Sequence, residues 1–107
     1  MALEYLMTFF LLEKKPEILV QNLYRLKDYN YSEIPRLYQE AVLVYELTAK
    51  KKADLHGYQI SEATRKQFKN FLEIDNRYYG NKELGLKELA KYHGDSYMFY
   101  HTKKIRR

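Results

Sequence analysis

Histidines, carboxylates and serines are the residues through which this sequence could do chemistry. The three histidines are His56, His93 and His101. None follows another at a spacing of three or four residues, the spacing with which two imidazoles on one helix share a metal ion. His56 lies in a predicted loop and His93 at a predicted helix end, where capping and dipole roles are common for histidine. We therefore expect no metal site and no cofactor.

Two pairs of carboxylates have the residue types needed for general acid–base catalysis, as in glycoside hydrolysis. Glu33 and Glu40 lie seven residues apart on one predicted helix, and Glu83 and Asp95 flank another. Exposed acids are common on amphipathic helices, so neither spacing is specific to catalysis. An enzyme that uses these carboxylates is an alternative hypothesis, and it requires a cleft that holds two of them.

The sequence contains no recognisable nucleophile. Ser32, Ser61 and Ser96 stand at or near predicted helix caps, and none lies in a nucleophile-elbow pattern. The 107 residues include no cysteine, which excludes thiol chemistry, a disulfide scaffold and cysteine-ligated metals. A glycine-rich phosphate loop is also missing. The sequence predicts a protein that is not an enzyme, and it assigns no catalytic residue.

Positive charge is concentrated at the C-terminus. The formal net charge is +5, and residues 103–107 supply +4 of it, so residues 1–102 carry only +1. A nucleic-acid-binding domain usually has a basic stripe on its folded surface, which this distribution does not indicate. Because the charge pattern gives only weak support, nucleic-acid binding is the alternative hypothesis for the function and not the leading one. It would use the tail and base stacking on tyrosines interleaved with Arg25, Arg36, Arg65 and Arg77.

Twelve tyrosines are the most unusual feature of the composition. Tyr5, Tyr38 and Tyr45 fall on apolar helix stripes and are most simply core residues. Others lie in predicted connectors, where tyrosine either closes the ends of helix layers or forms an interface, since its ring is apolar and its hydroxyl polar. We favour the structural role and keep the interface as the alternative. The connector tyrosines are Tyr29, Tyr31, Tyr58, Tyr78 and Tyr79.

The hydrophobic pattern is helical along the whole chain. Apolar residues recur at spacings of three and four, and no stretch shows sustained alternation. The fold class is therefore all-α, with antiparallel helical hairpins made of about five helices and a short C-terminal helix. We expect one domain over residues 1–102 and a basic, disordered tail over residues 103–107. The helices are predicted over residues 3–14, 16–27, 33–51, 62–78 and 82–93, and after Asp95.

The first predicted helix has apolar residues on more than one side. Its main stripe comprises Leu3, Leu6, Met7, Phe10 and Leu11. Tyr5, Phe9 and Leu12 widen that stripe, so we expect the helix to be covered on two sides. The longest apolar run, residues 5–12, is much shorter than the roughly 20 residues of a membrane-spanning helix.

Several residues predict where the later helices begin. Ser32 is the predicted N-cap of the third helix, with Pro35 tolerated in its first turn. Ser61 and Asn81 are the predicted N-caps of the fourth and fifth helices, and Gly80 separates these two helices.

Two segments resemble a known family. Residues 34–41 (IPRLYQEA) resemble a proline–aromatic–Gln-Glu-Ala motif, and residues 94–100 (GDSYMFY) resemble a Gly-Asp-small-aromatic-x-aromatic-Tyr ending. With residues 2–5 and 80–83, they resemble the C-terminal region of an uncharacterised Bacteroidetes family of multi-span membrane proteins. The soluble end of that family is similar to tetratricopeptide-type helical hairpins. The resemblance implies no activity, and it implies that the natural protein continues upstream into membrane spans.

The residues themselves support a tetratricopeptide-like packing style only. Ala41 and Tyr45 match small and aromatic positions of that repeat, but no second copy of the pattern follows at 34 residues. The first predicted helix also starts without a capping residue before it. We therefore expect the sequence to be a fragment of a longer chain.

We therefore predict a non-enzymatic helical-hairpin module for protein interaction or scaffolding, within a larger membrane protein. Its partner would be a protein or peptide. This segment would be soluble, and the membrane side and oligomeric state stay open. The predicted interaction surface is the exposed face of the third helix with the terminal aromatic turn. Its residues are Arg36, Gln39, Glu40, Tyr97 and Tyr100.

Overall fold

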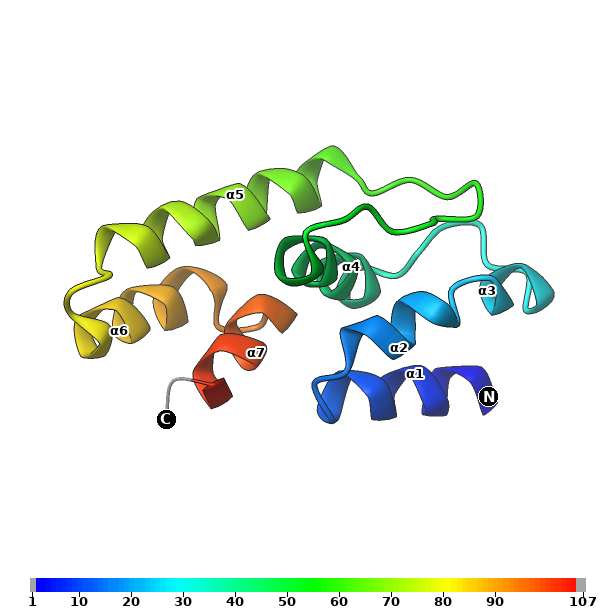
Figure 1. The fold of residues 1–107 in the computed structure, drawn as a ribbon, viewed down its shortest axis with the longest axis horizontal. Coiled ribbons are helices and arrows are strands. Elements are labelled where there is room, and N and C mark those ends of the chain that lie inside the picture. The colour runs from blue at the N-terminus through cyan, green and yellow to red at the C-terminus, as the bar shows by residue number, and fades with distance from the viewer. Residues whose placement is uncertain (1, 106–107) are drawn as a thin grey trace.

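Figure 1 shows the computed structural model, which describes the backbone of residues 2–105 and the side chains of residue 3 and residues 5–101. Over these residues the chain is helical and contains no strand, which confirms the all-α prediction there. The helices are α1 (Ala2–Leu12), α2 (Pro16–Gln21), α3 (Arg25–Asp28), α4 (Arg36–Ala49), α5 (Glu62–Arg77), α6 (Lys82–His93) and α7 (Tyr97–Ile105).

The central helix is α4, which packs against α1, α2, α5 and α7. Figure 1 shows α4 almost end-on, whereas α1, α2, α5 and α6 run across the view. It therefore crosses its neighbours and is not half of an antiparallel hairpin. Short turns join antiparallel partners in the α1–α2 and α5–α6 pairs (Figure 1). The predicted hairpins thus form towards the two ends of the chain, with a crossing helix between them.

The predicted caps of α5 and α6 are confirmed. The Ser61 hydroxyl accepts a hydrogen bond from the Thr64 N–H at 3.1 Å, and Asn81 Oδ1 accepts one from the Leu84 N–H at 3.2 Å. The predicted start of the third helix is wrong, because α4 begins at Arg36 and not near residue 33. Pro35 has an extended ψ of 149°, and proline disfavours helical geometry in the residue before it.

The second predicted helix, residues 16–27, is divided into α2 and α3. Asn22 lies at the division, and its side-chain amide donates to the Ile18 carbonyl at 2.8 Å. Asparagine competes in this way with the backbone donors that would continue a helix. The backbone N–H groups of Asn22 and Leu23 reach carbonyls three residues back instead of four, so the chain tightens here.

The last helix, α7, continues to Ile105 and so includes three residues of the predicted tail. Residues 106 and 107 of that tail lie outside the described residues. In the described part of the chain, no helix is both long enough and apolar enough to cross a membrane.

The inner stripe of α1 is in the core as predicted, with Leu3 and Met7 almost fully buried. Its other side is not covered. Tyr5 is 80% exposed, Leu12 55% and Phe9 48%. The expectation of a helix covered on two sides is therefore wrong, because α2 and α4 pack only on its inner side.

The α5–α6 hairpin depends on a small residue at one close approach. A Cβ atom on Gly85 would lie 2.9 Å from Tyr78 Cβ, which is too close for two carbon atoms. We expect Gly85→Ala to lower the free energy of unfolding by about 1–2 kcal/mol in a urea titration, despite the higher helix propensity of alanine. Gly80→Ala is the matched control. A Cβ atom there meets nothing within 4 Å, so we expect no loss of stability. Equal effects of the two substitutions would contradict the packing argument.

Candidate interaction groove

A groove of about 680 Å³ opens between three segments that are distant in sequence. The C-terminal half of α1 lines one side through Thr8, Leu11 and Leu12. The start of α4 and the residues before it line the second side. The third side is the corner between α6 and α7, residues 94–97, together with Tyr100. Most of the lining is apolar or aromatic, which is typical of binding grooves.

Three of the five predicted interaction residues line this groove, namely Arg36, Tyr97 and Tyr100. The side chain of Arg36 is 55% exposed at the rim, Tyr97 is buried and Tyr100 is half-buried. Gln39 and Glu40 are not on an exposed face as expected, because only 6% and 3% of their surfaces are exposed. The loop before α5 covers Gln39 and the start of α7 covers Glu40.

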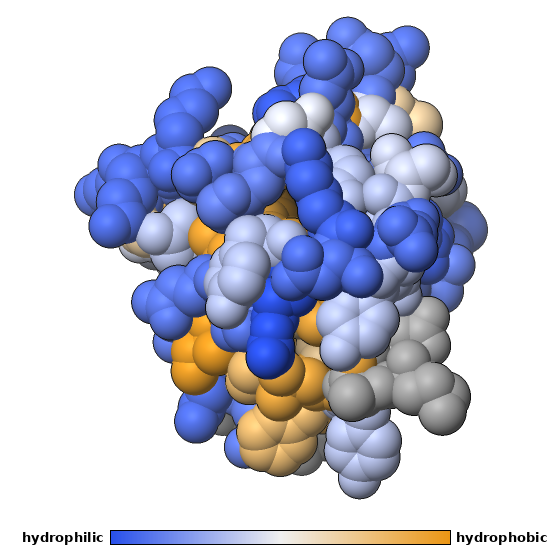
Figure 2. All heavy atoms as spheres, turned by 90° about the vertical axis from the view of Figure 1, so that its right-hand side faces the viewer, coloured by the Kyte–Doolittle hydropathy of each residue, from blue (hydrophilic) through white to orange (hydrophobic). Residues whose placement is uncertain are grey.

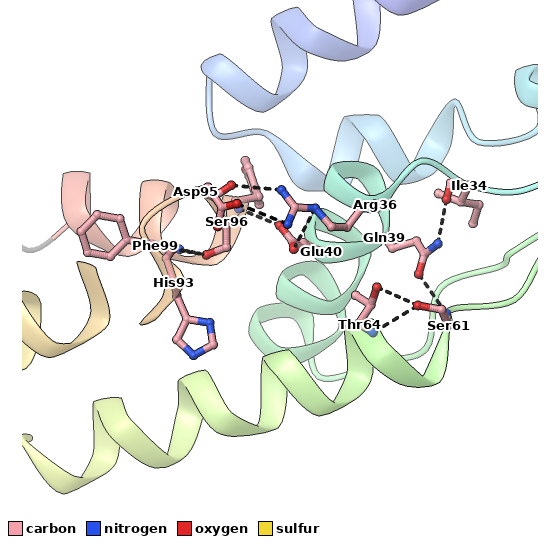
Figure 3. Close-up of polar contacts among 11 residues, drawn as sticks. Ile34, Arg36, Gln39, Glu40, Ser61, Thr64, His93, Asp95, Ser96 and Phe99 are labelled. Carbon is pink, nitrogen blue, oxygen red and sulfur yellow. Dashed lines mark hydrogen bonds and ion pairs between the residues drawn. The ribbon is translucent and has the colours of Figure 1, made fainter. Parts of the chain in front are cut away.

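Arg36 holds the α6–α7 corner against α4 (Figure 3). Its Nη1 atom lies 3.6 Å from Asp95 Oδ2, and its Nη2 donates to the Asp95 carbonyl at 3.3 Å. Its Nε lies 3.8 Å from Glu40 Oε2. The guanidinium is thus shared between two carboxylates, so the positive charge of Arg36 is compensated at this rim.

Glu40 supplies a cap to a helix that is distant in sequence. Its Oε1 accepts a hydrogen bond from the Tyr97 N–H at 2.8 Å, at the first turn of α7. Burial raises the pKa of the Glu40 carboxyl above its usual value, while this hydrogen bond and the Arg36 charge oppose that shift. Ser96 caps the same helix, because its hydroxyl accepts from the Phe99 N–H at 3.1 Å.

Gln39 joins three parts of the chain from the opposite side of α4 (Figure 3). Its amide nitrogen donates to the Ile34 carbonyl at 2.7 Å. Its amide oxygen accepts from the Ser61 N–H at 2.9 Å. The segment before α4 and the start of α5 are therefore both fixed to α4 by one buried side chain.

Tyr97 has an unsatisfied polar atom beside the groove. The residue is 3% exposed, and among the described residues its hydroxyl has no hydrogen-bond partner. Burial, with smaller contributions from Glu17 and Tyr100, raises the pKa of this hydroxyl, so it stays protonated. Tyr100 differs, because its hydroxyl donates to the Leu12 carbonyl at 3.0 Å and ties α7 to the end of α1.

Each of the three histidines contacts other side chains, and His56 Nε2 lies 3.8 Å from Asp54 Oδ2. His93 is buried, with Nε2 2.8 Å from Asn70 Oδ1 and its ring edge-on to Phe71. Burial lowers the pKa of His93, although Asp95 partly opposes this. Burial also lowers the pKa of His101, and Lys14 adds to the effect while Glu17 opposes it. Among the described side chains, no three histidine or acidic residues form a group that could hold a metal ion.

Sequence reasoning missed the residues that α1 contributes to the groove. The apolar pattern of the first helix predicts that Leu12 is covered, and nothing in the sequence marks Leu37 as part of an exposed surface. Leu37 is 39% exposed and lines the groove. The sequence indicates Asp95 only as one of a pair of carboxylates, yet it is the principal partner of Arg36. The only signal for Asp95 was its place in the Gly-Asp-Ser segment that carried the family resemblance.

The two segments that carried the resemblance, residues 34–41 and 94–100, thus meet across the groove. A family model described as a family of unknown function, DUF6057, matches residues 1–104. The chain belongs to the DUF6057 family. Comparison of this DUF6057 chain with curated proteins and with solved structures gave no match.

Proposed function

We propose that this DUF6057 chain is a non-enzymatic helical module that binds a protein partner in the groove between α1, α4 and the α6–α7 corner. The observation that supports this most directly is an open groove with a largely apolar lining, in which Leu12 and Leu37 remain exposed. Exposed apolar side chains that gather at one concave site are typical of interaction surfaces. The Arg36 guanidinium at its rim is already paired with Asp95 and Glu40, which favours an apolar partner segment over an acidic one.

The wider context is also a proposal. The family resemblance supports a module at the C-terminal end of a larger membrane protein from the Bacteroidetes. It does not indicate on which side of the membrane the module lies. Tetratricopeptide-like packing is proposed for the α5–α6 hairpin, where two antiparallel helices approach closely at Gly85.

Nucleic-acid binding has less support from the geometry. The arginines expected to stack with bases do not share one surface. Arg36 is held by Asp95 and Glu40, and Arg65 and Arg77 stand near opposite ends of α5. A continuous track of stacking groups, as single-stranded nucleic acids require, is not built by these positions.

Peptide selection tests the proposed function without knowledge of the natural partner. Peptides from a random display library are selected on the immobilised chain and titrated into it with amide chemical shifts as the readout. We expect apolar peptides with dissociation constants on the order of micromolar to shift the amides of residues 36–38 and 94–97. Leu37→Glu should weaken this binding at least about tenfold, because it places a charge in the groove.

Leu47→Glu is the matched control, since Leu47 is on the same helix and is 51% exposed but does not line the groove. We expect it to leave the binding within about twofold of the wild type. Selection of no peptide, or of peptides that shift amides elsewhere, would overturn the proposal. Salt-dependent binding of single-stranded nucleic acid in its place would favour the alternative.

A further inference from the structure

The outer side of α1 is an apolar surface that nothing in the described chain covers. Tyr5, Phe9 and Leu12 follow one another at spacings of four and three, so they line one side of the helix and form an outer ridge. Figure 2 shows apolar atoms gathered at the bottom of the view, where α1 lies. A helix that is apolar on all sides is usually buried on all sides.

The outer ridge is free of charge. Residues 5–12, with the sequence YLMTFFLL, contain no acidic or basic residue, whereas exposed helix faces usually carry several. The exposed parts of the ridge and Leu37 offer on the order of 400 Å² of apolar surface, from roughly 150–250 Å² for a whole aromatic side chain. A contiguous patch of this size commonly marks an interaction site.

The outer ridge and the groove lie on adjoining surfaces. Leu12 belongs to both, and Thr8, which lines the groove, directly precedes Phe9 of the ridge. A self-complementary twofold interface needs two matching features next to each other on one chain, so that each copy offers both to the other. An uncharged ridge beside an apolar groove meets this requirement.

The charges at the groove also favour the outer ridge of a second copy as the partner segment. Because Arg36 is already shared between Asp95 and Glu40, the groove has little to offer an acidic segment. The outer ridge is an uncharged segment, with the two aromatic rings of Tyr5 and Phe9 and the aliphatic side chain of Leu12.

We propose that the groove of one copy receives the outer ridge of a second copy, so that the chain forms a twofold-symmetric dimer. This rests on the proposed function and names the partner as a second copy of this chain. Two such patches bury on the order of 800 Å² in total, less than the roughly 1,200 Å² of a stable specific interface, so the dimer is weak and reversible, with a dissociation constant on the order of tens of micromolar.

Sedimentation equilibrium between about 5 and 500 µM tests this dimer, because its population depends on concentration. We expect the double variant Tyr5→Ser/Phe9→Ser to raise the dissociation constant at least about tenfold. The matched control is Tyr79→Ser/Tyr92→Ser, whose tyrosines are 76% and 57% exposed and lie outside the ridge and the groove. It should dimerise like the wild type, and circular dichroism checks that each variant is folded.

A mixing experiment distinguishes a dimer with the ridge in the groove from other modes of dimerisation. Tyr5→Ser/Phe9→Ser retains the groove, and Leu37→Glu retains the ridge, so a mixture restores one of the two contacts. We expect the mixture to associate more tightly than either variant alone. Leu47→Glu should dimerise normally.

Several outcomes would overturn the dimer. One is a monomer at all concentrations, and another is a dimer that ignores the ridge substitutions. A third is a dimer that depends on the ridge but not on Leu37, which would indicate contact between two ridges. A chain that stays monomeric but sediments with lipid vesicles through Tyr5 and Phe9 would assign the ridge to a membrane surface. In the monomeric cases, peptide binding in the groove would still leave the proposed function standing.

Discussion

Replacing Gln39 with leucine is expected to lower the free energy of unfolding by about 2–4 kcal/mol, one of the two largest effects of a single substitution that we predict. The side chain is 6% exposed and pairs with the Ile34 carbonyl and the Ser61 N–H. Leucine has a similar size but no polar atom. The Ile34 carbonyl would then lose its partner in a buried site and the Ser61 N–H in a partly buried one, at about 1–3 kcal/mol for a fully buried group. Urea unfolding followed by circular dichroism measures the loss.

The exposed Gln67 on α5 provides the control, because Gln67→Leu removes the same amide where water can replace it. We expect a change within about 0.5 kcal/mol. Gln39→Glu sharpens the test. A protonated carboxyl can donate to Ile34 and accept from Ser61, so this variant should recover stability at low pH, whereas Gln39→Leu should not. Equal costs for Gln39→Leu and Gln67→Leu would show that Gln39 does not join these segments.

The sequence predicts most of the helices, because they depend on local interactions. Ser61 and Asn81 cap α5 and α6 as expected, since an N-cap bonds to a residue only three positions away. The break between α2 and α3 is also local, but it depends on one side-chain rotamer. Asn22 donates to Ile18, and the same residue could as well have pointed to solvent within a continuous helix.

The candidate site is less predictable, because it is built from contacts between distant residues. Glu40 and Tyr97 are 57 positions apart, and no periodicity connects them. Periodicity marks which residues are apolar but cannot say how many sides of a helix will be covered. Tyr5 and Phe9 therefore looked like core residues, and only the packing of α1 against α2 and α4 leaves them outside.

The crossing of α4 has the same origin. Short turns predict antiparallel neighbours, but the loop between Ala49 and Glu62 is long enough to permit any crossing of the helices that it joins. The crossing direction is then decided by buried polar side chains. Gln39 holds the start of α5 on one side of α4, and Glu40 holds the start of α7 on the other.

Replacing Glu40 with leucine is expected to lower the free energy of unfolding by about 2 kcal/mol, because the Tyr97 N–H loses its charged acceptor in a buried site. Arg36 is not stranded by this change, since it is more than half exposed and keeps Asp95. Amide hydrogen exchange at the first turn of α7 should become faster. Glu40→Gln retains an acceptor oxygen, so it should keep α7 docked and cost much less than leucine.

The comparison of wild type with Glu40→Gln should depend on pH. The pKa of Glu40 is raised in the folded chain, so the folded state binds its proton more tightly than the unfolded state does. As the pH rises from about 4.5, the carboxyl ionises first in the unfolded state. The contribution of Glu40 to the stability of the wild type therefore decreases. The glutamine variant has no such dependence. The stability of Glu40→Gln relative to wild type should therefore increase with pH.

His93 and His101 act in the opposite direction, because their lowered pKa values make stability fall as the pH drops below about 6.5. Both histidines are present in wild type and variant, so the difference between the two proteins isolates Glu40. Urea titrations at several pH values between about 4 and 7 measure this difference. A difference that stays constant or decreases with pH would mean that burial does not dominate the electrostatics of Glu40. The Arg36 and Tyr97 contacts would then outweigh the cost of placing a carboxylate between α4 and α7.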